Sequence, residues 1–159
     1  MAASDNTRAT DLIRNEHRNV ETLFQQLEKT TEPEEKEAIF GTIAVEMSVH
    51  SEITDKVFYP AAKKAIGNEA IVVKAHEEQQ HLKTLIDQLR RLLADLDKDE
   101  FDSKANALRA AAEAHWRAEE EELLPAVEKS DLDLVQLGQQ MMQLQQDLSG
   151  AGLGSQGPM

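Results

Sequence analysis

Apolar residues recur every three or four positions along almost the whole chain, which is the period of an amphipathic α-helix. Five segments follow this pattern, and we expect helices at 10–29, 34–65, 69–96, 101–129 and 132–148. The first four are long and joined by short connections, which is typical of an antiparallel up-down-up-down four-helix bundle. The fifth helix is shorter and should pack on one end or side of the bundle.

Prolines and glycines divide the pattern further. Pro60 and Pro125 fall late in the second and fourth segments, and each predicts a kink or an end of the helix nearby. Residues 1–9 are predicted to form a flexible N-terminus, and residues 10–148 the helical bundle. The glycine- and serine-rich segment 149–159 is predicted to be a disordered tail.

Composition narrows the chemistry of this all-α domain of 159 residues. The chain has no cysteine, which excludes disulfides, a thiolate zinc site, an iron–sulfur cluster and a cysteine nucleophile. Its formal charge of −13 argues against nucleic acid and membrane surfaces as partners. No apolar run approaches a signal peptide or the roughly 18 residues of a membrane helix, so we expect a cytoplasmic protein.

Three histidines are directed toward the buried faces of three different helices. With about 100° per residue, His17 lies about 20° from Phe24, His50 about 20° from Ile43, and His115 about 20° from Leu108. Glu119 follows His115 by one turn on a similar face. A single inward histidine is more often a hydrogen-bonded core residue than a ligand. Three of them with a carboxylate indicate a metal site, because burying the set without a shared partner would be costly.

Other ionisable residues are weaker candidates. His81 faces the polar side, and His76 lies on the flank of its stripe, where a surface role is favoured over a place near the site. Glu46 and Glu122 point roughly inward, either as acceptors for imidazole N–H groups or toward solvent at helix ends. The remainder of the 119–122 glutamate run is interpreted as a solvated face, with Glu119 alone singled out by direction.

The motifs resemble those of the hemerythrin-like (HHE cation-binding) family. The resemblance rests on a histidine in the first helix, a histidine before Phe-Tyr-Pro in the second, and HxxxE before Leu-Leu-Pro in the fourth. The similar segments are 11–24, 50–60, 82–89 and 115–125, together with Leu137-Gly138. The resemblance implies a non-haem di-iron site, held by one histidine, HxxxE, one histidine and HxxxE from successive helices, with two bridging carboxylates.

Carried over residue by residue, the family's metal ligands match His17, His50, His115 and Glu119. Two ligand positions differ: Thr54 stands where a bridging glutamate is expected, and Gln79 where the third helix should supply a histidine. Three outcomes stay open: a weakened or rearranged di-iron site, a mononuclear site on His17, His50 and Glu119, and a bundle without metal.

The resemblance implies a non-haem iron-binding protein that interacts with dioxygen or a related small oxidant such as peroxide or nitric oxide, with zinc as the alternative metal. The competing hypothesis is a metal-poor or mononuclear bundle that acts as an interaction or sensing module. A ferritin-like oxidase is rejected, because Glu78-Gln-Gln-His81 is the one Glu-x-x-His spacing and its histidine faces outward. No serine lies in a nucleophile elbow.

Overall fold

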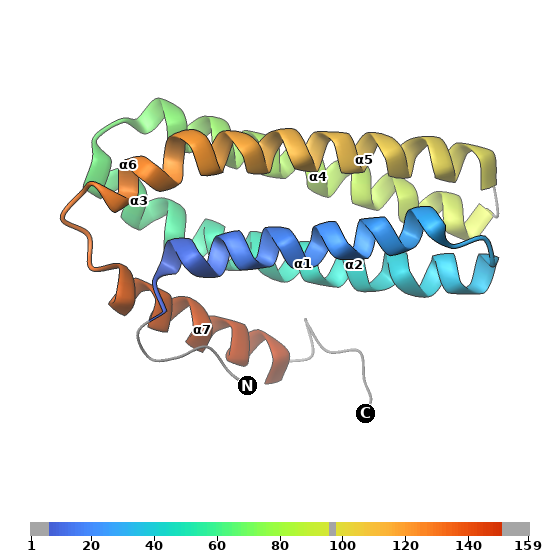
Figure 1. The fold of residues 1–159 in the computed structure, drawn as a ribbon, viewed down its shortest axis with the longest axis horizontal. Coiled ribbons are helices and arrows are strands. Elements are labelled where there is room, and N and C mark those ends of the chain that lie inside the picture. Colours follow the sequence, from blue (N-terminus) through green and yellow to red (C-terminus); the bar gives the residue numbers. More distant parts are fainter. Residues whose placement is uncertain (1–6, 96–97, 151–159) are drawn as a thin grey trace.

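The computed structural model describes residues 7–95 and 98–150, which form helices joined by short connections (Figure 1). The bundle has four arms, each made of one long helix or of consecutive helical segments. The first and third arms are the single helices α1 (Ala9–Lys29) and α4 (Glu69–Asp95). The second arm is α2 (Pro33–Ile53), continued by η1 (Thr54–Phe58) and α3 (Tyr59–Ile66). The fourth is α5 (Lys98–Ala118), continued by η2 (Glu119–Leu123) and α6 (Leu124–Glu128). The last helix of the described residues is α7 (Leu134–Gly150).

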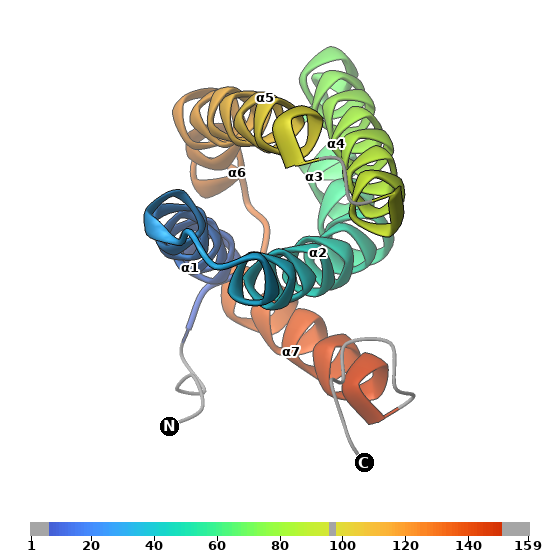
Figure 2. The same cartoon turned by 90° about the vertical axis from the view of Figure 1, so that its right-hand side faces the viewer.

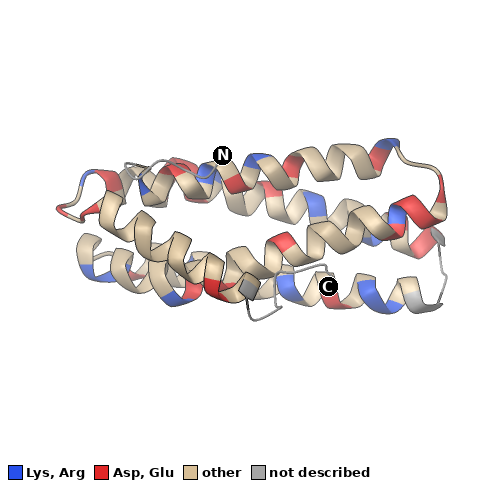
Figure 3. Cartoon of the chain, turned by 90° about the horizontal axis from the view of Figure 1, so that it is seen from below, with Lys and Arg blue, Asp and Glu red and all other residues tan. Residues whose placement is uncertain are grey.

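The four arms form the antiparallel bundle that the sequence predicts, with α7 as the fifth helix. Seen from the end, α1, α2, α4 and α5 surround a common core, and α7 lies outside it against α1 and α2 (Figure 2). Acidic and basic residues are interspersed along the helices (Figure 3). Within the described part, no helix is long and apolar enough to cross a membrane. The predicted N-terminus and tail lie mostly outside the described residues.

The core consists of two apolar clusters with a polar layer between them. One cluster includes Ile13, Ile53 and Leu123, and the other includes Val20 and Met47. The buried polar side chains that separate the two along the bundle are His17, His50, Thr54, Gln79, His115 and Glu119. The polar layer is therefore enclosed above and below by hydrocarbon, which lowers its effective dielectric constant.

In each of the two arms with a late proline, the regular α-helix ends shortly before that proline and continues through one π-helical turn. In η1 the Tyr59 N–H bonds to the Thr54 carbonyl five residues earlier, and in η2 the Leu124 N–H bonds to the Glu119 carbonyl in the same way. Pro60 and Pro125 follow directly, and each lacks the N–H that a regular helix would use. Such turns are frequent at functional sites, and here both begin at a polar residue of the buried layer.

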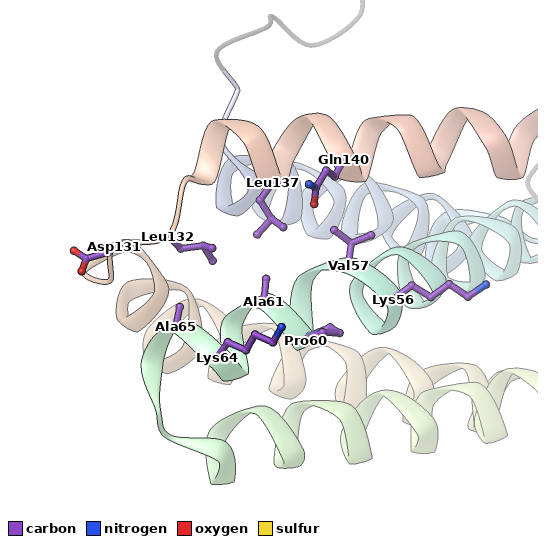
Figure 4. Close-up of a pocket in the computed structure, with 10 residues that line it drawn as sticks. All are labelled: Lys56, Val57, Pro60, Ala61, Lys64, Ala65, Asp131, Leu132, Leu137 and Gln140. Atoms are coloured by element: carbon purple, nitrogen blue, oxygen red, sulfur yellow. The ribbon is translucent and has the colours of Figure 1, made fainter.

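The last helix is held close to the start of the first. Gly138 in α7 lies so near α1 that a Cβ atom there would be 2.6 Å from the Thr7 carbonyl oxygen. Along its other edge, α7 forms a hollow of about 570 Å³ with α3. Figure 4 shows Val57, Ala61 and Leu137 facing into this hollow, which contains none of the buried polar residues.

Replacing Gly138 by alanine should destabilise the fold. The added methyl group would overlap backbone atoms of residues 7–9, so we expect a loss of about 1–3 kcal/mol in the free energy of unfolding, measured by urea denaturation. The matched control is Gly41→Ala in α2, where a Cβ meets nothing within 4 Å. That change should stabilise by about 0.5–1 kcal/mol through helix propensity alone. Equal effects of the two substitutions would contradict the close packing of α7.

Candidate metal centre

The carboxylate of Glu119 lies at the centre of the polar layer and is 2% exposed. Its Oε1 is 3.2 Å from the Nε2 atom of His17, and its Oε2 is 3.4 Å from the Nε2 atom of His115. The buried Tyr59 hydroxyl donates a hydrogen bond of 2.5 Å to the same Oε2. Side chains from α1, α3 and α5 thus converge on one acidic group at the start of η2.

The surroundings keep Glu119 ionised. Burial by itself would raise the pKa of this carboxyl, but its interactions with His17, His115 and His50 lower the pKa to about 2. Burial and the negative charge of Glu119 raise the pKa of Tyr59 far above its ordinary value, so this hydroxyl remains a neutral donor.

Each of the three inward histidines is held from behind by a carboxylate. The Nδ1 atom of His17 lies 2.7 Å from a carboxylate oxygen of Glu120, and the Nδ1 atom of His115 lies 2.9 Å from one of Glu78. The Nδ1 atom of His50 contacts the carboxylate of Glu16 in the same way. These glutamates are between 23% and 35% exposed at the edge of the bundle. An ionised carboxylate only accepts hydrogen bonds, so Nδ1 carries the proton and Nε2 presents a lone pair to the interior.

The atoms that face the interior have no hydrogen-bond partners within the described part of the chain. They are the Nε2 atoms of His17, His50 and His115 and the Oε1 atom of Glu119. Ligand atoms of His17, His50 and Glu119 lie within 4.8 Å of one another. Lone pairs that face an anion at this spacing are costly unless protons or a cation lie between them. The donor set therefore fits a metal ion, and a 2-His-1-carboxylate set suits iron(II).

The second metal position of the predicted pair is chemically different. His115 and the Oε2 atom of Glu119 face it, but Tyr59 already binds that oxygen. Thr54 and Gln79, both buried, bond to each other: the Gln79 amide donates to the Thr54 hydroxyl at 2.7 Å. Two neutral side chains thus stand where the resemblance implies a carboxylate and an imidazole.

The hydrogen bonds reveal an internal repeat that pairs α1–α3 with α4–α6. The hydrogen bond between His50 and Glu16 corresponds to that between His115 and Glu78, because each links the second helix of a half to the first helix of the same half. Likewise, the hydrogen bond of 2.7 Å between His17 and Glu120 corresponds to that of 3.3 Å between Gln79 and Asp55. Each of these links the first helix of one half to the π-helical turn of the other half. The two halves thus share the same pattern of hydrogen bonds to carboxylates, but a full set of metal ligands is present only at His17, His50 and Glu119.

The structure decides between the alternatives for the supporting residues. Glu46 and Glu122 are exposed, so the imidazole N–H groups bind other carboxylates. His76 is also exposed and bonds to Asp55 at 2.9 Å, away from the three clustered ligands, and His81 faces solvent as predicted.

Sequence reasoning missed four contributors: Glu16, Glu78, Glu120 and Tyr59. A signal was present, because Glu16, Glu78 and Glu120 each adjoin a residue of the ligand pattern in the sequence. Tyr59 belongs to the quoted Phe-Tyr-Pro motif but had no assigned role.

Comparisons with known proteins agree with this geometry. A family model described as "Hemerythrin HHE cation binding domain" matches residues 8–127, which leaves α7 beyond the match. A protein of Mycobacterium tuberculosis named as uncharacterised is 28% identical over 150 residues, covering 91% of this chain and 89% of its own length. A DNA nickase from a Nostoc species is 28% identical over 117 residues, and the match covers 74% of this chain but 32% of that protein.

The fold resembles a solved structure along most of its length. It is the crystal structure of a hemerythrin HHE cation binding domain-containing protein, the Rv2633c homolog from Mycobacterium kansasii. The TM-score is 0.78 at 22% sequence identity, with 92% of this chain and 90% of that chain covered. At this identity the likeness establishes the fold alone.

The carboxylate behind His50 should control metal affinity. Glu16→Gln keeps the shape but removes the charge that fixes the imidazole, so we expect affinity for Zn²⁺ or Co²⁺ to fall about 10–100-fold in a chelator competition titration. Glu77→Gln, an exposed carboxylate that contacts none of the three histidines, is the charge-matched control and should bind like wild type. Unchanged affinity in Glu16→Gln would contradict this role.

Proposed function

The chain belongs to the hemerythrin HHE cation-binding domain family, and we propose that it is a non-haem iron-binding protein that interacts with a small oxidant: dioxygen, peroxide or nitric oxide. The observation that carries the proposal is the convergence of His17, His50 and Glu119 on one buried point, with partnerless nitrogen and oxygen atoms facing it. Bound iron would supply the electrons that such an oxidant accepts.

The remaining residues of the site leave little space beside the ligands. A cavity of about 10 Å³ borders His17 and His50, and its other walls include the apolar side chains of Val20, Met47 and Leu82. This volume is about that of one water-sized probe. We infer that it favours molecules of a few atoms. Zinc fits the same ligands but has no redox chemistry, which favours iron for a reaction with an oxidant.

A nicking activity toward DNA, named for the Nostoc relative, has less support here. The match covers about a third of that protein, and this chain carries a net charge of −13, which repels a phosphate backbone.

The main proposal and its alternative differ in the number of metal ions that the site binds. His17, His50 and Glu119 form a complete set for one ion, whereas the other half keeps His115 and lacks two ligands at Thr54 and Gln79. The carboxylate behind His115 separates the cases. If a second ion binds, Glu78→Gln should weaken it, and if one ion binds, Glu78→Gln should affect total metal content far less than Glu16→Gln.

Metal content tests the proposal directly. Protein expressed in iron-replete medium should contain at least about one iron per chain, and Glu119→Gln should reduce that content, because it removes the buried charge that balances the cation. Elemental analysis with a protein assay measures both. Less than about a tenth of an equivalent of any transition metal would contradict the proposal.

Reaction with an oxidant is tested on the iron(II)-loaded protein. Addition of air-saturated buffer, peroxide or nitric oxide should change its ultraviolet–visible spectrum, because the iron can transfer electrons. The zinc-loaded protein is the matched control and should not respond, since zinc has no redox chemistry. A loaded protein whose spectrum responds to none of the three would limit the function to metal binding or sensing.

Restoring the missing ligands should add metal. The double variant Thr54→Glu with Gln79→His supplies a carboxylate and an imidazole at two buried positions that face the site, so we expect the iron content to rise by up to about one equivalent. Thr54→Gln with Gln79→Asn changes the same positions without adding ligands and should give no gain. A double variant with unchanged content would show that these positions do not hold a second ion.

A further inference from the structure

An acidic hollow lies on the outer side of α5 and η2, next to the candidate metal centre. It has a volume of about 460 Å³ and is lined by Glu113, Trp116, Arg117, Glu120 and Glu121. Three carboxylates and one guanidinium give the lining a formal excess of negative charge. A concave surface of one sign attracts oppositely charged ions and raises their local concentration.

Trp116 is the one residue that this hollow shares with the small inner cavity at His17 and His50. The indole is 7% exposed and stacks on the His17 ring, with centroids 5.1 Å apart and planes at 19°. It is therefore the side chain that borders both the outer hollow and the space beside the ligands.

His17 provides an independent link between the two spaces. Its Nδ1 atom contacts Glu120, which lines the outer hollow, and its Nε2 atom is buried without a hydrogen-bond partner on the opposite side of the ring. A cation attracted by the carboxylates of the hollow is thus one imidazole ring away from an unused ligand atom.

The other approaches to the site are less favourable for a cation. A cavity beside Glu119 and Glu78 is lined by three carboxylates and Lys74, as the hollow is by three carboxylates and Arg117, but its volume is only about 10 Å³. On the side of η1, Asp55 is within 3.6 Å of the Lys83 ammonium group. The hollow is therefore the wider of these two cavities, both of which border carboxylates of the site.

We propose that the metal ion enters the candidate centre through the hollow formed by Glu113, Glu120 and Glu121, and that Trp116 is the movable wall it passes. This inference rests on the proposed metal-binding function. It assigns an entry site for a divalent cation to carboxylates that hold no place in the ligand set. Movement of the indole would join the two spaces, because it is the one side chain that lines both.

The test measures Co²⁺ uptake by the metal-free protein in a stopped-flow spectrometer, and Co²⁺ release to an excess of chelator. Trp116→Ala should raise both rates about tenfold and leave the equilibrium affinity within about threefold, because a wall affects passage in both directions. Trp116→Phe keeps an aromatic ring against His17 and should give intermediate rates. If Trp116→Ala lowers affinity without faster uptake, Trp116 only supports His17 and the entry route is wrong.

Charge at the hollow is tested separately. Glu121 is exposed, and Glu121→Gln should lower the uptake rate about twofold at low ionic strength, with the difference lost at high salt and the release rate unchanged. Glu35→Gln, an exposed carboxylate at the start of α2, is the charge-matched control and should have a smaller effect. Equal effects of the two would overturn the route.

The outcomes separate the two proposals. If the wild-type protein takes up no Co²⁺ at equilibrium, the metal-binding function fails and the route fails with it. If wild type and the Trp116 and Glu121 variants all bind Co²⁺ with the same rates, only the entry route is overturned.

Discussion

Burial of the Glu119 carboxylate between two apolar clusters is the constraint on which the rest of the structure depends. An ion taken out of water costs several kcal/mol unless its surroundings replace the lost hydration. Here Tyr59 donates one hydrogen bond, and the Nε2 atoms of His17 and His115 lie within 3.4 Å, where a proton or a cation between them and the carboxylate would complete the replacement. Each arm must therefore face inward at one height, and the partly exposed glutamates behind the imidazoles keep that arrangement in place.

The internal repeat explains how two halves with the same hydrogen-bond pattern can carry different numbers of metal ligands. Both halves keep a carboxylate behind each inward position, and Asp55 still binds Gln79 as Glu120 binds His17. The side without a full ligand set is filled by neutral hydrogen bonds among Thr54, Gln79 and backbone carbonyl groups. Thr54 and Gln79 thus need no ion to satisfy their polar groups, whereas the Nε2 atom of His115 beside them has no hydrogen-bond partner among the described residues.

Periodicity predicted the helices, and the angle of each histidine predicted which side chains meet, because both depend on local geometry that the chain itself carries. The carboxylates behind the histidines could not be found in this way. Glu16 and Glu78 lie at the partly exposed edges of their helices, and their roles appear only once the neighbouring helix is placed. The direction of Glu122 could not be decided from a regular helix either, because it lies inside η2, where a π-helical turn changes the angle per residue.

Trp116 is the only tryptophan in the chain, and it stacks directly on His17. The protein therefore contains a native fluorophore at the wall of its own candidate centre. Emission excited selectively in the indole arises from this one position and carries no background from elsewhere in the fold. A paramagnetic ion at His17 would quench that emission, whereas Zn²⁺, with its filled d shell, would leave it largely intact. Unlabelled protein can thus report both whether the site is filled and which class of ion fills it.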